Sequence, residues 1–277
     1  MMRRRSWLFT PGTKPERFNR AAEAGADVVI IDLEDAVAAG DKGAARAAAM
    51  EWLSRAPDGQ TWRSLRINAP GTAFGLEDVL ALLHSGAQPD AIIVPKADSP
   101  DILRLLDGLL TQAGKAARLI ALIESAGGVE KAEAMARATP RLDALFFGAA
   151  DFAADLGADC AWEPLLLARS RVVQAAALGG LAAIDSPYFM LGDDPGLRAE
   201  THASIRLGFV GKAAIHPRQV TVINEALTPS AEAVAEARHI LLESLKGVGV
   251  VSGRMVDEAV ARKARRVLAA AGQPAVA

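Results

Sequence analysis

The sequence predicts an α/β protein built as a (β/α)₈ barrel, a closed ring of eight parallel strands surrounded by helices. The chain has 277 residues, close to the roughly 250 of a typical barrel of this kind. Short apolar runs recur about eight times, and they do not alternate with polar residues. Longer amphipathic segments separate them. Buried parallel strands connected by helices produce this pattern.

The apolar runs give eight expected strands at residues 6–10, 27–31, 62–67, 91–94, 119–123, 144–147, 181–184 and 209–215. The expected helices cover residues 14–24, 42–55, 76–83, 100–110, 129–138, 164–178 and 195–207. Pro100, Pro164 and Pro195 suit the first turn of a helix. An open, doubly wound sheet is the alternative, but the glycines lack the spacing of a dinucleotide-binding loop.

The C-terminal part of the chain predicts a different organisation. We expect a catalytic barrel over residues 1–225 and a helical extension over residues 226–277. Two helices are expected in the extension, at residues 230–245 and 255–271, joined by the glycine-containing segment 247–253. No strand is expected after about residue 225. The extension would either cap the barrel or pack on a neighbouring subunit.

Composition argues against several classes of partner. The formal net charge of −2 gives no general electrostatic reason to expect nucleic acid or an anionic membrane. Cys160 is the single cysteine, so neither an intramolecular disulfide nor a thiolate metal cluster can form. The apolar stretch near the N-terminus is interrupted by Pro11 and Gly12 and is too short for a signal peptide. No uncharged run reaches the ~18 residues of a membrane span. We expect a soluble, cytoplasmic protein.

Charged residues follow most of the expected strands, where barrel enzymes carry their chemistry. These residues are Asp32, Glu34, Asp35, Arg66, Lys96, Glu124, Asp151, Asp185, Lys212 and His216. Burying unpaired charge is costly, so any single one of them has a structural ion pair as its alternative. A stability role alone does not require charges to collect at one end of a barrel.

Glu124 and Asp151 follow consecutive strands, so their carboxylates are expected to converge. Two carboxylates with open water positions suit a hard cation, Mg²⁺ or Mn²⁺. The four histidines show no zinc spacing, and His216 has a structural reading beside a catalytic one. The sequence therefore predicts a metal site formed by Glu124 and Asp151.

Three further features carry charge, and the first two of them have two interpretations each. Arg66 would grip a substrate carboxylate with two hydrogen bonds, or pair with Glu34 or Asp35. Residues 3–5, Lys14 and Arg17 form a basic cluster that is either solvated or contacts a phosphate. Asp257, taken alone, is a carboxylate at a helix N-terminus.

Eight segments, in order along nearly the whole chain, resemble the citrate lyase β-subunit and malyl-CoA lyase family within the HpcH/HpaI aldolase superfamily. They are residues 5–12 (RSWLFTPG), 26–37 (ADVVIIDLEDAV), 65–68 (LRIN), 94–96 (VPK), 123–129 (IESAGGV), 147–157 (FGAADFAADLG), 208–217 (GFVGKAAIHP) and 253–257 (GRMVD). Departures include Thr10 in place of a frequent valine and Ala150 in place of a common glutamate. Neither replaces an expected metal ligand.

The resemblance implies roles for matching residues. Glu124 and Asp151 would bind Mg²⁺, and Arg66 would hold the carboxylate of the substrate, with Glu124 bordering the same site. Asp257 would act as acid or base from an adjacent subunit of a homo-oligomer, commonly a trimer in this family. The segments that contain Lys14, Arg17 and Lys212 would lie near a bound CoA or acyl-carrier thioester.

The resemblance thus implies an Mg²⁺-dependent carbon–carbon lyase. Its substrate would be a hydroxy-carboxyacyl thioester of the citryl, malyl or citramalyl type, cleaved to an α-keto acid or glyoxylate and an acyl thioester. Two alternatives stay open: a class II pyruvate aldolase that acts on a free hydroxy-keto acid, and a non-catalytic subunit that binds CoA or an acyl carrier.

Overall fold

The computed structural model describes residues 4–57, 59–245, 249–251 and 254–273. The chain divides into a barrel unit, Arg4–Ile223, and a C-terminal unit that begins at Asn224. Arg3 of the predicted basic cluster and parts of the predicted glycine segment 247–253 lie outside the described residues.

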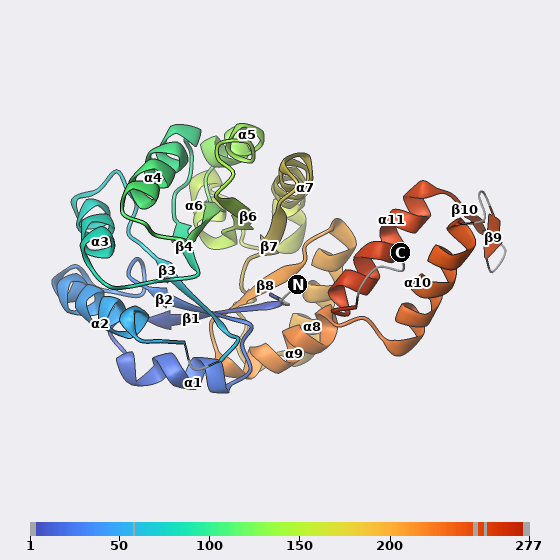
Figure 1. The fold of residues 1–277 in the computed structure, drawn as a ribbon, viewed down its shortest axis with the longest axis horizontal. Coiled ribbons are helices and arrows are strands. Elements are labelled where there is room, and N and C mark those ends of the chain that lie inside the picture. Colours follow the sequence, from blue (N-terminus) through green and yellow to red (C-terminus); the bar gives the residue numbers. More distant parts are fainter. Residues whose placement is uncertain (1–3, 58, 246–248, 252–253, 274–277) are drawn as a thin grey trace. The chain divides into compact units, whose positions relative to one another are not determined.

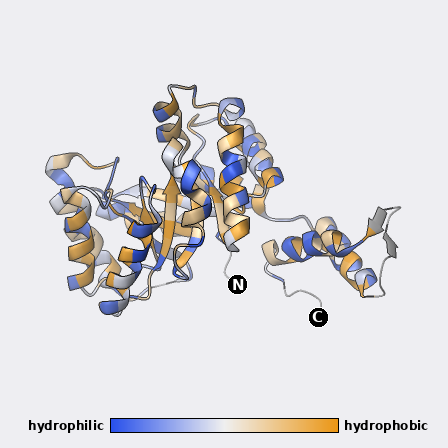
Figure 2. Ribbon diagram, turned by 90° about the horizontal axis from the view of Figure 1, so that it is seen from above, coloured by the Kyte–Doolittle hydropathy of each residue, from blue (hydrophilic) through white to orange (hydrophobic). Residues whose placement is uncertain are grey.

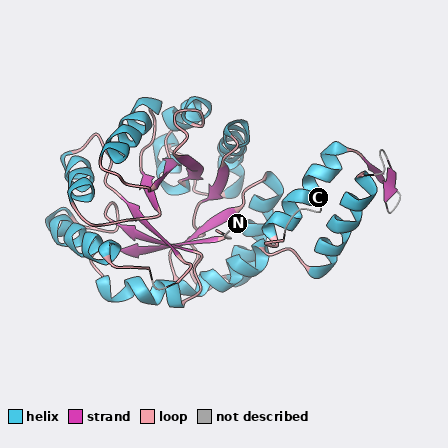
Figure 3. Cartoon of the chain, viewed as in Figure 1, coloured by secondary structure: helices cyan, strands magenta, loops and turns pink. Residues whose placement is uncertain are grey.

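The barrel unit is a closed ring of eight parallel strands, as predicted. Figures 1 and 3 show the ring with the helices on its outside. The strands are β1 (Ser6–Pro11), β2 (Val28–Asp32), β3 (Trp62–Arg66), β4 (Ala91–Val94), β5 (Arg118–Ile123), β6 (Leu142–Phe147), β7 (Ala182–Asp185) and β8 (Gly211–Ala214). The ring closes between β1 and β8, where Trp7 pairs with Ala213.

Alternate residues of the strands fill the barrel interior, because side chains along a strand point to opposite faces. The interior cluster includes Trp7, Val28, Ile93, Ile120 and Phe146, all almost fully buried. The intervening residues face the helices, and on most strands they are apolar as well; β3, with Arg63 and Ser64, is an exception. Figure 2 shows this concentration of hydrophobic residues on the strands.

The outer helical elements are η1 (Pro15–Arg17), α1 (Phe18–Glu23), η2 (Ala39–Asp41), α2 (Lys42–Ser54), α3 (Ala73–His84), α4 (Pro100–Gln112), α5 (Ala126–Met135), α6 (Ala149–Leu156), α7 (Trp162–Gly179), α8 (Asp194–Leu207) and α9 (Pro217–Leu227). Helices α6 and α9 were not predicted. Helix α6 has only eight residues, too few for its periodicity to stand out. None of the described helices combines the length and apolar character needed to cross a membrane.

The C-terminal unit contains the predicted helix pair, α10 (Ala231–Ser244) and α11 (Glu258–Ala270). Ala237, Leu241, Ala261, Ala264 and Leu268 form its core. The expectation of no further strands was wrong, since β9 (Gly249–Val251) and β10 (Arg254–Val256) form a two-stranded antiparallel sheet. Each of these strands has only three residues, which is too short for a sequence pattern to reveal.

Candidate active site

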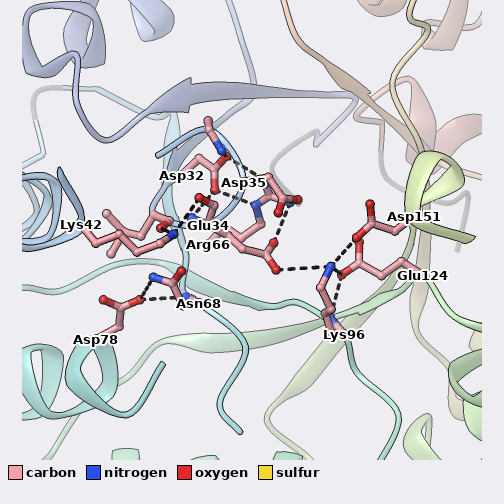
Figure 4. Close-up of polar contacts among 12 residues, drawn as sticks. Asp32, Glu34, Asp35, Lys42, Arg66, Asn68, Asp78, Lys96, Glu124 and Asp151 are labelled. Atoms are coloured by element: carbon pink, nitrogen blue, oxygen red, sulfur yellow. Dashed lines mark hydrogen bonds and ion pairs between the residues drawn. The ribbon is translucent and has the colours of Figure 1, made fainter. Parts of the chain in front are cut away.

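Polar side chains gather at the C-terminal ends of β2 to β6. Asp32 and Arg66 are the last residues of β2 and β3, and Glu124 directly follows β5. Lys96 lies two residues beyond β4, and Asp151 lies in the first turn of α6, after β6. Figure 4 shows these side chains directed toward one another. The parallel strands bring them together because their ends share one rim of the barrel.

Arg66 is held by acidic residues of the β2–α2 loop. Its Nε and Nη2 donate to the two oxygens of Asp32 at 2.7 and 2.6 Å. Its Nη1 lies 3.0 Å from Glu34 Oε2 and 3.5 Å from Asp35 Oδ2. Although close to Arg66, Glu34 Oε2 is buried and accepts no hydrogen bond in the described part of the chain. Arg66 therefore has the acidic partners that one reading predicted, together with Asp32, which fixes its orientation.

Burial changes the acidity of two carboxyl groups in this cluster. It raises the pKa of Glu34 to about 8, against the opposing effect of the Arg66 guanidinium. It raises the pKa of Glu124 to about 7, against hydrogen bonding from the Lys96 backbone. A nearby divalent cation would favour the ionised form of both groups.

Glu124 is positioned by its backbone surroundings. Its Oε1 accepts a hydrogen bond from the Lys96 N–H at 2.7 Å. A Cβ atom at Gly148 would lie only 2.7 Å from Glu124 Cβ and 2.8 Å from Glu124 Oε2. Glycine at 148 therefore allows the Glu124 side chain to pass close to the start of α6.

A hydrogen bond connects the segments that carry Glu124 and Asp151. Asp155, one turn after Asp151 on α6, accepts a hydrogen bond from the Ala126 N–H at 2.7 Å. Ala126 begins α5, two residues after Glu124. The two carboxylates also share a cation: Lys96 Nζ contacts Asp151 and lies 3.8 Å from Glu124 Oε1. The predicted convergence of Glu124 and Asp151 is thus present around Lys96.

Two supporting residues, Lys42 and Asp78, were missed by sequence reasoning. Lys42 donates to the carbonyl oxygens of Leu33 and Glu34 at 2.8 and 2.9 Å. Asp78 is fully buried and accepts two hydrogen bonds from Asn68. Lys42 begins α2, where the helix dipole disfavours a cation. A lysine at the first position of a helix could therefore have indicated a specific role for Lys42. Asp78 gave no such indication, because in the sequence it resembles an ordinary surface residue of a helix.

The donor set fits a hard divalent cation. The described residues contain no group of three or more His, Cys, Asp or Glu side chains arranged to hold a metal. However, Mg²⁺ commonly uses one or two protein carboxylates and keeps several waters. Glu124 and Asp151 supply that pair, and the buried Glu34 Oε2 without a hydrogen-bond donor is suited to accept from such a water.

Asp185, the last residue of β7, and Lys212 of β8 belong to a separate, neutralised network. Lys212 is fully buried, and its Nζ donates to Asp185 and Glu200 at 2.8 Å each. Arg169 also donates to Asp185, at 3.0 Å. Burial alone would raise the pKa of Asp185, but Lys212 and Arg169 hold it below the usual value. This geometry does not support the predicted contact of Lys212 with CoA, because its ammonium is enclosed between carboxylates.

The predicted basic cluster is divided by β1. Arg4 and Arg5 precede the strand and pair with Asp143 and Asp27. Lys14 and Arg17 follow it and are exposed. The four residues therefore do not form one patch, and only Lys14 and Arg17 lie beyond the strand end that borders the site.

Two other candidates have local structural roles. His216 Nδ1 accepts a hydrogen bond from the Arg218 N–H at 3.2 Å, at the start of α9. Asp257 Oδ1 accepts from the Val260 N–H at 2.9 Å and caps the N-terminus of α11. Asp257 belongs to the C-terminal unit, so its predicted action on the barrel site of another subunit stays a prediction.

The closed barrel, with charged side chains gathered at the C-terminal ends of its strands, is typical of the class of barrel enzymes. Comparison with known proteins is more specific. Residues 5–217 match the family model of HpcH/HpaI aldolase/citrate lyase, and the chain belongs to this family. Residues 169–272 match a second model, the carbon–carbon bond lyase of the TIM-barrel fold.

Similar proteins include enzymes that act on CoA thioesters. An L-malyl-CoA/beta-methylmalyl-CoA lyase of Cereibacter sphaeroides is 38% identical, over 95% of this chain and 93% of that protein. The structure of RipC from Yersinia pestis is 46% identical with a TM-score of 0.74, covering 83% of this chain and 97% of RipC. CitE from Mycobacterium tuberculosis, in complex with magnesium, acetoacetate and coenzyme A, is 35% identical with a TM-score of 0.82, covering 97% and 98% of the two chains.

Proposed function

We propose that this protein is an Mg²⁺-dependent carbon–carbon lyase that cleaves, or forms, a hydroxy-carboxyacyl-CoA thioester of the malyl, citramalyl or citryl type. The observation that carries the proposal is the convergence of Glu124 and Asp151 beside a fixed Arg66. Membership of the HpcH/HpaI family and similarity to a malyl-CoA lyase support the reaction class. The complex of CitE with magnesium, acetoacetate and coenzyme A supports the metal and the coenzyme A part of the substrate.

Each group has a proposed task. Glu124 and Asp151 would hold Mg²⁺, which when bound supplies electrostatic stabilisation to the oxygens of the keto-acid part. Arg66, fixed by Asp32, presents Nη1 to the substrate carboxylate, which would replace Glu34 and Asp35 as its partner. These charges favour the negative charge that develops as the carbon–carbon bond breaks.

Asp257 is the proposed acid for the other product. In the cleavage direction it would protonate the carbon of the thioester enolate, and in condensation it would remove that proton. We propose that it is supplied by an adjacent subunit of a homo-oligomer, a trimer or a multiple of one. Lys14 and Arg17 are exposed beyond β1 and are proposed to contact the phosphates of CoA, because their positive charge suits an anionic ligand.

The primary test combines metal removal with isosteric substitutions. Release of keto acid is measured from malyl-CoA, citramalyl-CoA and citryl-CoA, with EDTA and after restoring Mg²⁺. Glu124→Gln and Asp151→Asn are expected to lose metal binding and turnover. Glu133→Gln and Asp159→Asn, at exposed positions of the same region, are matched controls. Full metal-dependent activity in either ligand variant would refute the assigned site.

Two alternatives are separated by substrate. A class II pyruvate aldolase would use free pyruvate and ignore acetyl-CoA, so a condensation assay with each donor distinguishes it from the thioester lyase. A non-catalytic subunit would bind CoA thioesters without turnover across the whole panel.

A further inference from the structure

The Lys96 side chain lies among the carboxylates of the site. Its Nζ contacts Asp151 and lies 3.6 Å from Glu34 Oε1 and 3.8 Å from Glu124 Oε1. These carboxylates come from three segments, after β2, after β5 and in α6. Figure 4 shows the ammonium between the Arg66 cluster and the Glu124–Asp151 pair. Lys96 is therefore the local counterion of three acidic groups.

The backbone of Lys96 adopts a left-handed conformation that is uncommon for a residue other than glycine. Its φ of 50° is the single positive value among the described non-glycine residues. A long side chain rarely adopts this conformation, and such residues are often found at functional sites. Here it accompanies two interactions at one residue: the N–H holds Glu124, while the side chain reaches Asp151. In this conformation, Lys96 contacts Glu124 through its backbone and Asp151 through its side chain.

The ammonium position conflicts with a metal ion. A cation held by Glu124 and Asp151 at the ~2 Å distances of Mg²⁺ would lie within a few Å of the Lys96 Nζ. Like charges at that separation repel strongly. The Lys96 side chain is 49% exposed, so it has a path toward solvent.

We propose that Lys96 is an internal counterion that a divalent cation must displace. The inference rests on the proposed metal site of Glu124 and Asp151. The lysine neutralises the carboxylates when the metal is lost and thereby weakens metal binding, since the metal replaces an existing ion-pair network. Its backbone N–H keeps Glu124 oriented in both states.

Mg²⁺ affinity distinguishes the proposed role from simple damage to the site. Loss of the Lys96 charge is expected to tighten Mg²⁺ binding, whereas damage to the site would weaken it. In Lys96→Met the backbone N–H and the side-chain bulk remain, but the charge is removed. Isothermal titration with MgCl₂, and Mn²⁺ titration followed by electron paramagnetic resonance, are expected to show a dissociation constant lower by roughly tenfold, equivalent to about 1.4 kcal/mol. General damage to the site would raise this constant.

Three variants complete the experiment. Lys96→Arg keeps a cation and is expected to bind Mg²⁺ within about threefold of the natural protein. Lys96→Gln, a second neutral variant, is expected to behave like Lys96→Met. Lys131→Met removes one charge from an exposed position of α5 and is the matched control. Thermal unfolding in EDTA is expected to show a lower midpoint for the neutral Lys96 variants and a larger rise on adding Mg²⁺.

The possible failures are distinguishable. If neither neutral variant binds Mg²⁺ more tightly than the natural protein and Lys131→Met, the counterion role is refuted. If Glu124→Gln also leaves Mg²⁺ affinity unchanged, the proposed metal site itself is refuted.

Discussion

Gly148→Ala is a specific perturbation of the proposed metal site. The added Cβ would lie 2.7 Å from Glu124 Cβ and 2.8 Å from Glu124 Oε2. Reaching an ordinary contact of 3.4 Å requires a relative movement of about 0.7 Å. The close atom at Glu124 is its Cβ, next to the main chain, so a rotation of the carboxylate cannot relieve the contact. Either the start of α6, which carries Asp151, or the end of β5 must shift.

The expected magnitude follows from the geometry. Mg²⁺ sites tolerate deviations of about 0.2 Å in ligand distance, less than the movement that the methyl group requires. We expect Mg²⁺ affinity to fall by roughly 10- to 100-fold, as when other supporting groups of metal ligands are changed. The free energy of unfolding is expected to fall by about 1–3 kcal/mol from overpacking.

Isothermal titration with MgCl₂ measures the first effect, and urea unfolding in EDTA measures the second. Gly108→Ala is the control, since a Cβ there meets nothing within 4 Å and alanine is favoured inside α4. Gly148→Ala with the Mg²⁺ affinity of the natural protein would show that close approach of Glu124 to residue 148 does not position the ligand.

Three further predictions concern charge. In EDTA, stability is expected to fall by a few kcal/mol from pH 5 to 8: Glu34 and Glu124 have pKa values raised by burial to about 8 and about 7, so the folded protein keeps protons that the unfolded chain releases above about 4.5. Glu34→Gln should flatten this dependence in urea unfolding, and an unchanged slope would contradict the assignment. Lys212→Met is expected to cost about 3–5 kcal/mol in urea unfolding, because Glu200 and Asp185 lose a buried partner; reduced CoA-thioester affinity with unaltered stability would instead restore its predicted binding role. Asp257→Asn keeps a helix-capping side chain, so the unfolding temperature should be unaltered while turnover falls roughly 10²- to 10⁴-fold; natural kcat would exclude Asp257 as the acid.

The fold was predictable because its signals are local and repeated. Most of the eight strands are short apolar runs, and the prediction for β4 matches the structure at both ends, Ala91–Val94. Strand β3 is an exception, because Arg63 and Ser64 interrupt it. The proximity of Glu124 and Asp151 was predictable because both carboxylates follow strands, whereas their role as metal ligands stays a prediction. By contrast, β9, β10 and α6 are too short to show periodicity.

The supporting interactions at the site join residues that are far apart in the sequence. No local sequence pattern indicates which residues will pair. Arg66 and Asp32 are 34 positions apart, and Lys96 and Asp151 are 55 apart. Lys212 illustrates the reverse problem. It stands in a segment that resembles a thioester-binding region, yet folding places its charge between Asp185 and Glu200. Only the three-dimensional arrangement separates a buried cation from one that meets a ligand.

The proposed site residues are distributed unevenly among the strand ends, and this has a consequence for engineering. The carboxylates of the proposed active site follow β2, β5 and β6, whereas Asp185 of β7 is neutralised below the surface by Lys212 of β8 and by Arg169. The loop after β7 exposes Phe189, Met190 and Leu191 and contributes none of the proposed metal ligands. A library confined to residues 189–191 would therefore vary an exposed apolar loop without changing any of the proposed metal ligands.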